Sequence, residues 1–481
     1  FVPVFTLQAQ EGRLFRPLAF TKTYSMAMAS IVAITVVPVL MYWFVRGKIR
    51  SEKSHPVSRL LRAIYTPLLN VALNWRWLVV ILAFAAVASV WFPLQHIGSE
   101  FMPPLWEGDL LYMPTTFPGI SITKAKELLH QTDKIIASFP EVESVLGKIG
   151  RAETATDPAP LSMIETTIVL KDPSEWRPGM TKEKLIEELD QAIQFPGLTN
   201  AWTMPIKTRI DMLSTGIKTP VGIKIGGPDL SELERIGKEV EALVKPLEGT
   251  LSAYAERVLG GTYLDFEIDR EAAARYGITV GDVQDVIMSA IGGMNVSWTV
   301  EGLERYPINI RYPRELRDNV HAVAETLIVA PSGAQVPLSQ LAEIRIHQGP
   351  PAIKSENARP NAWVFVDLRG LDVGTWVTRA KQEVAEKIEL PPGYTIFWSG
   401  QYEYMERAKA RLLMIVPITL LVVFLILYLN TGSLTKTAIV LLAVPFSAVG
   451  AIWLMYFLGY NWSIAVWVGL IALAGLDAET G

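Results

Sequence analysis

The sequence contains no cysteine and only five histidines among 481 residues. The absence of cysteine excludes disulfide bonds and thiolate metal sites. The histidines form no close-spaced pair, so they give no sign of an imidazole site for zinc, cobalt or nickel; they are His55, His96, His130, His321 and His347. An initiator methionine is also missing, and the last residues, DAETG, lie within an apolar stretch. We therefore interpret the chain as a piece of a longer, transporter-like polypeptide.

Motifs for nucleotide use and for common hydrolases are absent as well. The sequence has no GxxxxGK[ST] phosphate loop, no nucleophile elbow and no HExxH. Its net charge is -4, and no basic stripe with interleaved aromatics occurs. We expect neither an enzyme nor a nucleic-acid-binding protein, and no resident cofactor.

Long apolar runs are the main feature that is present. Hydrophobic residues make up 50% of the chain and charged residues 19%, a balance typical of a protein with both membrane and aqueous parts. Bilayer spans are predicted at 26–45, 77–94, 411–429, 437–458 and 463–481. The connection 46–76 carries seven basic residues against one acid, Glu52, so the positive-inside rule places it in the cytoplasm. There we expect an amphipathic helix along the membrane surface, with the segment from about 98 to 408 on the opposite side.

That outer segment alternates strand-like and helix-like patterns. Residues 98–219 read as strand, helix, strand, strand, helix, strand, which is a split β-α-β unit. A second unit starts at Val221, includes strands near 251–258 and 262–268, and closes only at 356–408, so residues 278–355 are an insertion. We predict α-helical membrane spans at 1–45, 77–97 and 409–481, and a large α+β domain of two split βαβ (ferredoxin-like) subdomains, 98–219 and 220–277 with 356–408.

Three methionines lie far apart in this outer domain, at Met113, Met163 and Met212. A thioether is a soft ligand that favours Cu(I)-like ions, although methionine is also an ordinary core residue. Spacings of 50 and 49 residues match no helical face, so only the tertiary fold can bring the three together. On the strand at 163–170, alternation places Glu165 on the same face as Met163.

Two acids, Asp477 and Glu479, end an otherwise apolar span. Acidic residues at membrane depth are energetically costly and mark ion pathways. They lie two positions apart on a helix and therefore point in different directions.

Several motifs together resemble one transporter family over the whole chain. They are FMPPLWEGDLLYMPTTFPGIS, GRAETATDPAPLSMIETTI, RIDMLSTGIKTP, ENARP and GLIALAGLDAETG. The sequence is similar to the heavy-metal-efflux branch of the resistance-nodulation-division (RND) transporters, and within it to copper and silver exporters of the Cus/Sil type.

The resemblance implies roles for individual residues. Met113, Met163 and Met212 match the metal-binding methionines of the family, and Glu479 matches its relay glutamate, with Asp477 as a weaker candidate for the proton path. Charged residues implied to line the metal cleft, together with Glu165, are Glu107, Asp157, Arg209 and Lys218. One position that carries a relay methionine in the family reads Asn295 here. Its neighbour Met294 is a candidate substitute, although it would face the other way on a strand.

The resemblance also implies a trimer in the Gram-negative inner membrane. Proton influx would drive Cu(I) or Ag(I) from the periplasm or cytoplasm through a periplasmic adaptor and an outer-membrane channel. The two subdomains would then be porter subdomains, and 278–355 a docking insertion. Two alternatives remain: an RND exporter of divalent metals, and a membrane-anchored periplasmic metal-binding module without transport.

Overall fold

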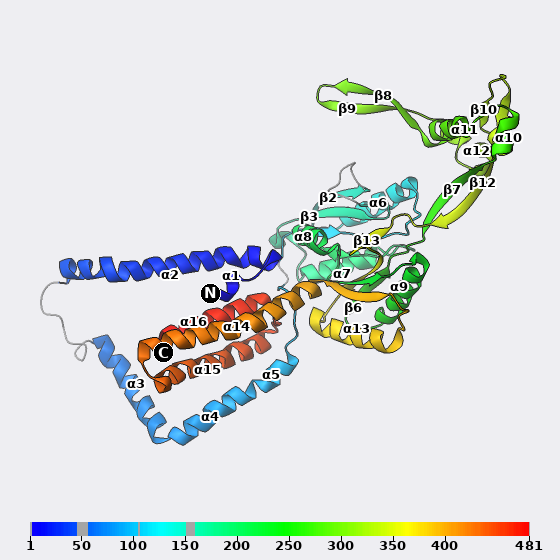
Figure 1. The fold of residues 1–481 in the computed structure, drawn as a ribbon. Coiled ribbons are helices and arrows are strands. Elements are labelled where there is room, and N and C mark those ends of the chain that lie inside the picture. Colours follow the sequence, from blue (N-terminus) through cyan, green and yellow to red (C-terminus); the bar gives the residue numbers. More distant parts are fainter. Residues whose placement is uncertain (1, 46–55, 104–105, 151–158, 481) are drawn as a thin grey trace.

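The computed structural model describes residues 2–45, 56–103, 106–150 and 159–480. Membrane-type helices and a mixed α/β domain occupy opposite ends of the molecule, as predicted (Figure 1). The first helices are α1 (Val2–Phe5), α2 (Ala9–Phe44), α3 (Pro56–Asn74), α4 (Arg76–Ser89) and α5 (Trp91–His96), and the last are α14 (Gln401–Thr431), α15 (Leu434–Leu458) and α16 (Ile464–Thr480). Most of the basic residues expected between the first two spans, Arg46, Lys48, Arg50 and Lys53, lie outside the described residues.

Among the described residues, four helical segments are long and apolar enough to cross a membrane: Glu11–Phe44, Arg76–His96, Gln401–Thr431 and Leu434–Leu458. Each overlaps one of the five predicted spans. The fifth is also helical, but its apolar part, Ile464–Asp477, is shorter. Helix α3 forms where the amphipathic connection was expected.

The first outer subdomain has the predicted element order. It consists of β1 (Leu110–Tyr112), α6 (Ile122–Ala137), β2 (Val142–Ile149), β3 (Ile164–Leu170), α7 (Lys182–Ala192) and β4 (Trp202–Thr203). The strands form an antiparallel sheet in the order β2-β3-β1-β4. Alternate residues of β1, Leu110 and Tyr112, pack with Ile136 of α6 and Leu185 of α7 in one core. Helix α8 (Pro205–Thr215) follows the last strand.

The second outer subdomain repeats this topology. It comprises β5 (Val221–Gly226), α9 (Leu230–Val244), β6 (Thr250–Ala255), β14 (Arg359–Leu368), α13 (Val373–Lys387) and β15 (Thr395–Gly400). Pairing gives the order β6-β14-β5-β15, and the short strand β13 (Lys354–Glu356) also pairs with β14. The predicted repeat of the split unit is therefore present, with its third strand supplied after the long insertion.

One predicted strand forms but has a different partner. The strand expected at 262–268 is β7 (Gly261–Ile268), which pairs along its whole length with β12 (Ala342–Gly349) and does not enter the five-stranded sheet. Alternation in the sequence indicates a strand but does not specify its neighbour. Leu264, Phe266 and Ile268 pack against a separate core beyond the sheet. The excursion from the second subdomain thus starts at this ribbon, before the boundary expected at 278.

The ribbon leads to a distal unit and a long hairpin (Figure 1). The unit contains α10 (Arg270–Arg275), α11 (Val280–Val286), α12 (Val320–Ala324), β10 (Leu327–Val329) and β11 (Gln335–Pro337). The hairpin consists of β8 (Met294–Glu301) and β9 (Glu304–Ile310). Short 3-10 helices occur at Pro173–Glu175, Arg314–Leu316 and Leu338–Gln340, and a π-helix at Ile287–Gly292.

Hydrogen bonds join the membrane helices to the second subdomain. Trp462, between α15 and α16, accepts a hydrogen bond at its carbonyl from the Glu100 amide at 2.8 Å and donates to the Gly98 carbonyl at 2.8 Å. The Ser99 amide donates to Asp372 Oδ1 at 2.6 Å, and that carboxylate also caps α13 by accepting from the Thr375 amide at 2.9 Å. The linker 98–101 therefore contacts both the segment just before α16 and the start of α13.

Candidate metal-binding site

Met113 and Met163 lie on neighbouring strand segments. Met113 directly follows β1 and is 1% exposed, and its amide donates to the Ala201 carbonyl at 2.9 Å. Thr115 forms an antiparallel bridge with Met163, in the same register that pairs β1 with β3. That register places Glu165 opposite Met113.

The alternation of side chains decides which face these residues occupy. Leu110, Tyr112 and Ile168 belong to the core under α6 and α7. Residues at odd positions of β1 and β3 point to the opposite face of the sheet. Met113, Met163 and Glu165 therefore share the face that is turned away from that core, as the alternation of Met163 and Glu165 predicted for β3.

Met212 reaches this region on α8. The helix ends at Gly216, whose φ of 76° is left-handed and whose amide donates to the Met212 carbonyl at 2.8 Å. Two residues later, Lys218 Nζ donates to the Met113 carbonyl at 3.0 Å and to Thr115 Oγ1. Lys218 thus joins the segment that follows the Met212 helix to the strand segment of Met113 and Thr115, and Met163 and Met212 are half-buried.

Lys218 lies in an environment that disfavours its charge. Burial lowers the pKa of its ammonium to about 8; the Glu256 carboxylate opposes this shift, and the neighbouring Lys354 ammonium adds to it. Glu165 and Asp367 also favour the charged form. The Lys218 ammonium, which loses its proton more readily than an ordinary lysine, therefore lies beside the strand segment of Met113.

Three of the other four predicted cleft charges, Glu165, Glu107 and Arg209, lie among the described residues. Glu165 pairs with Lys148 at 3.0 Å. Glu107 accepts hydrogen bonds from the Ile206 and Lys207 amides, both at 2.7 Å, so it anchors the first turn of α8. Arg209 is exposed and has no hydrogen-bond or ion-pair partner among the described residues. Asp157 lies outside the described residues.

Met294 lies on the distal hairpin and not on the sheet that carries Met113. It starts β8, opposite Ile310, and is 39% exposed. The adjacent Asn295 accepts a hydrogen bond from Asn309 Nδ2 at 3.0 Å across the hairpin. Figure 1 shows this hairpin extending from the distal unit.

The two membrane acids lie on α16 near its C-terminal end. Asp477 accepts a hydrogen bond from Ser447 Oγ of α15. The side chain of Glu479 lies outside the described residues. The structure therefore gives a partner for Asp477 alone.

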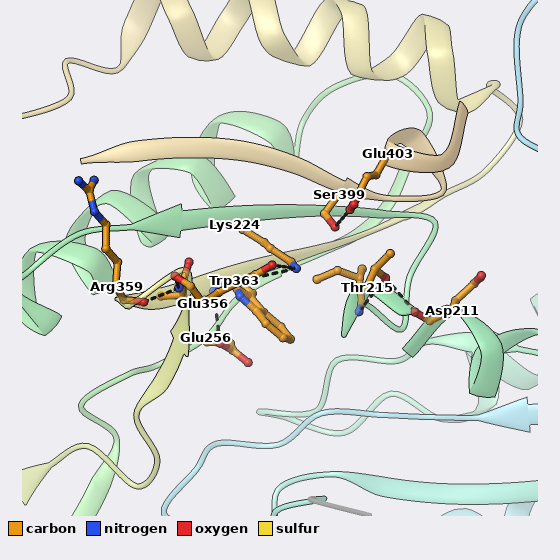
Figure 2. A network of polar contacts seen from close by, with 11 residues as sticks. Asp211, Thr215, Lys224, Glu256, Glu356, Arg359, Trp363, Ser399 and Glu403 are labelled. Carbon is orange, nitrogen blue, oxygen red and sulfur yellow. Dashed lines mark hydrogen bonds and ion pairs between the residues drawn. The ribbon is translucent and has the colours of Figure 1, made fainter. Parts of the chain in front are cut away.

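Sequence reasoning missed several residues that lie close to the methionines along the chain or contact their segments. Thr115, which joins the two strands, follows Met113 in the motif LLYMPTT, and Gly216 follows Met212 in RIDMLSTGIKTP. Trp363, shown in Figure 2, follows the ENARP motif closely. These motifs marked the segments but not the contacts. Among the described residues, no group of three or more His, Asp or Glu side chains is arranged to hold a metal ion.

Comparisons with known proteins cover the full chain. The sequence profile of the AcrB/AcrD/AcrF family matches residues 1–481. The chain is 49% identical over 481 residues to cation efflux system protein CusA of Escherichia coli K12, and 50% identical to putative cation efflux system protein SilA of Salmonella typhimurium. The cobalt-zinc-cadmium resistance protein CzcA of Cupriavidus metallidurans is 32% identical over 491 residues.

The alignments cover 100% of this chain and 46% of each of these relatives, so the chain spans about half their length. A crystal structure of a heavy metal efflux pump superimposes with a TM-score of 0.86 at 28% identity, covering 99% of this chain and 47% of that one. These findings confirm the resemblance to the heavy-metal RND pumps. The chain belongs to the AcrB/AcrD/AcrF family and corresponds to a central piece of one of its RND efflux pumps.

Proposed function

We propose that this chain is the central part of a proton-driven exporter of Cu(I) and Ag(I), which binds the ion through Met113, Met163 and Met212. The observation that carries the proposal is the shared sheet face of Met113 and Met163, with Lys218 tying the end of the Met212 helix to the Met113 backbone. Three neutral sulfur ligands suit a soft monovalent cation. The similarity to CusA and SilA, both cation efflux proteins by name, supports the same function.

The charges around the methionines fit a cation site. Glu165, opposite Met113 in register, provides a carboxylate that can balance the ion. Lys218 supplies a positive charge when no ion is bound. Because its pKa is lowered, the ammonium can lose its proton at a small cost in free energy when a cation binds. Sulfur therefore selects the ion, and the flanking groups compensate for its charge.

Proton coupling is assigned to α16. Glu479 and Asp477 place ionisable groups at the end of an apolar helix, and inward movement of one proton supplies about 2.3 kcal/mol per 100 mV. The linker 98–101 gives a hydrogen-bonded route from this helix to the second subdomain.

The proposed assembly follows the resemblance. The exporter would be a trimeric antiporter in the Gram-negative inner membrane, with the α/β domain in the periplasm. The two split units act as porter subdomains. The distal unit and its hairpin act as the docking insertion for a periplasmic adaptor and an outer-membrane channel.

The test is Ag(I) and Zn(II) binding to the full-length pump, measured by calorimetry. The variant Met113→Ile/Met163→Ile/Met212→Ile should lose Ag(I) binding and still fold, because Met-to-Ile changes nearly conserve volume. The matched control is Met180→Ile, in the same subdomain but packed against its core. This control should bind Ag(I) like the unmodified pump.

Three results would contradict the proposal. If the triple variant still binds Ag(I), the three methionines are not its ligands and serve only in packing. Comparable Zn(II) binding would favour a divalent-metal exporter, as the name of the CzcA relative suggests. Binding without proton-dependent uptake into everted vesicles would instead indicate a metal-binding module.

A further inference from the structure

The indole of Trp363 packs against the end of the Met212 helix. Trp363 lies on β14 of the second subdomain. A Cβ added at Gly216 would lie 2.9 Å from Cζ3 of this indole and closer still to Cη2. Only a glycine leaves room for the ring, and the left-handed φ at this position also favours glycine.

Charged side chains hold the indole in place. Lys354 Nζ lies 3.9 Å from a ring centroid of Trp363, and Lys224 Nζ lies 5.0 Å from it. Lys224 pairs with Glu356 at 2.9 Å. Figure 2 shows Lys224, Glu356 and Glu256 around the ring. Such cation–π contacts fix an aromatic side chain in one orientation.

The backbone of Trp363 is fixed too. Glu256 accepts a hydrogen bond from the Trp363 amide at 3.2 Å, and the same carboxylate forms an ion pair with Lys354. The indole Nε1 is buried and makes no hydrogen bond to the described residues. Packing and the two lysines therefore hold the ring, and phenylalanine would lose no hydrogen bond at this position.

Gly216 transmits this contact to the methionine. Its amide donates to the carbonyl of Met212 itself, so the position of Gly216 defines the last turn that carries the thioether. At the other end, Glu107 holds the first turn of α8. The helix is thus fixed at both ends, and the second subdomain supplies the C-terminal contact.

We propose that Trp363 is a positioning residue for the metal ligand Met212, acting through Gly216. This inference rests on the proposed function, because it takes Met212 as a ligand. The ring need not touch the ion. Outer residues that orient metal ligands typically affect metal affinity by 10- to 100-fold.

The decisive variant is Trp363→Phe in the full-length pump. It removes the ring atoms next to Gly216 and keeps an aromatic face for Lys354. We expect Ag(I) affinity to fall about 10-fold, with an unfolding temperature close to that of the unmodified pump. The matched control is Trp398→Phe on β15 of the same sheet, which should leave affinity unchanged. Unchanged affinity in Trp363→Phe would overturn the inference.

A double-mutant cycle separates positioning from general damage. The effect of Trp363→Phe should disappear in a Met212→Ile background, where no thioether remains to be positioned, and persist in a Met163→Ile background. Equal effects in both backgrounds would overturn the positioning role of Trp363 but leave the proposed three-methionine site intact. If Met212→Ile by itself left Ag(I) affinity unchanged, the proposed three-methionine site would fail as well.

Discussion

Lys218 donates a hydrogen bond from its ammonium to the carbonyl oxygen of Met113, at 3.0 Å. The contact joins the segment directly after α8, the helix that carries Met212, to the strand segment that carries the buried Met113. Because burial lowers the pKa of Lys218 to about 8, this side chain can lose its charge under mildly alkaline conditions. The charge state of Lys218 therefore affects the local potential that an incoming cation meets.

Ag(I) affinity should rise with pH through about 8 in the unmodified pump. Thioethers do not titrate, whereas neutral Lys218 no longer repels a cation. In Lys218→Gln, affinity at pH 7 should be several-fold higher and nearly independent of pH between 7 and 9. Calorimetric titrations across this range measure both. The control Lys245→Gln removes an exposed charge at the end of α9 and should keep the pH response of the unmodified pump. If Lys218→Gln showed the same pH response as the unmodified pump, the prediction would be contradicted.

The same pKa shift has a consequence for stability. The folded pKa of Lys218 lies below its ordinary value of 10.5, so the unfolded state binds more protons between pH 8 and 10.5. Lys218 therefore makes the free energy of unfolding rise with pH across that window. Lys218→Gln should remove this contribution, which thermal unfolding at pH 8 and pH 10 would detect.

Glu107→Gln should weaken Ag(I) binding by loosening the first turn of α8. Glutamine can replace one of the two hydrogen bonds that Glu107 accepts from Ile206 and Lys207 but has no charge to interact with the helix dipole, a loss of about 0.5–2 kcal/mol. The control Glu183→Gln changes an acid in the first turn of α7, which carries no proposed ligand. If both variants bind Ag(I) normally, Glu107 has no effect on the position of Met212.

Asp367→Asn should stabilise the protein at pH 7.5. Burial raises the pKa of Asp367 from 3.8 to about 6, so the folded state binds more protons than the unfolded state between these values. Stability consequently falls as pH rises through this window, and the amide removes that cost, on the order of 1–3 kcal/mol. Unfolding temperatures measured from pH 4.5 to 7.5 test this prediction, and unchanged pH dependence in the variant would refute it.

Asp372→Ala should reduce proton-driven transport without changing Ag(I) affinity. It removes the cap of α13 and the acceptor for Ser99, the residue that joins this helix to the membrane helices. The control Asp229→Ala removes the comparable cap of α9, at a cost of about 1 kcal/mol, but no contact with the linker. Uptake into proteoliposomes under a pH gradient should fall only in Asp372→Ala. Equal losses in both variants would point to stability and not to coupling.

Much of the fold could be predicted from local pattern. The apolar runs identified the membrane helices because crossing a bilayer requires a long uninterrupted apolar segment. Alternation and helical periodicity predicted both split units, including the return of the second at 356–408. The partner of β7 could not be predicted, because a strand shows which of its faces is apolar but not the strand with which it pairs.

The sequence by itself predicted a soft-ligand site, through Met113, Met163 and Met212 in a chain without cysteine, and the local shape of each element. The tertiary structure decided which of these residues act together. Glu107, expected as a cleft charge, accepts two backbone hydrogen bonds from the first turn of α8, and Trp363 meets Gly216 across 147 positions of sequence. The physical reason is that such contacts depend on how two subdomains pack against each other. Periodicity in the sequence reports which face of a helix or strand is apolar, but not which distant segment packs against that face.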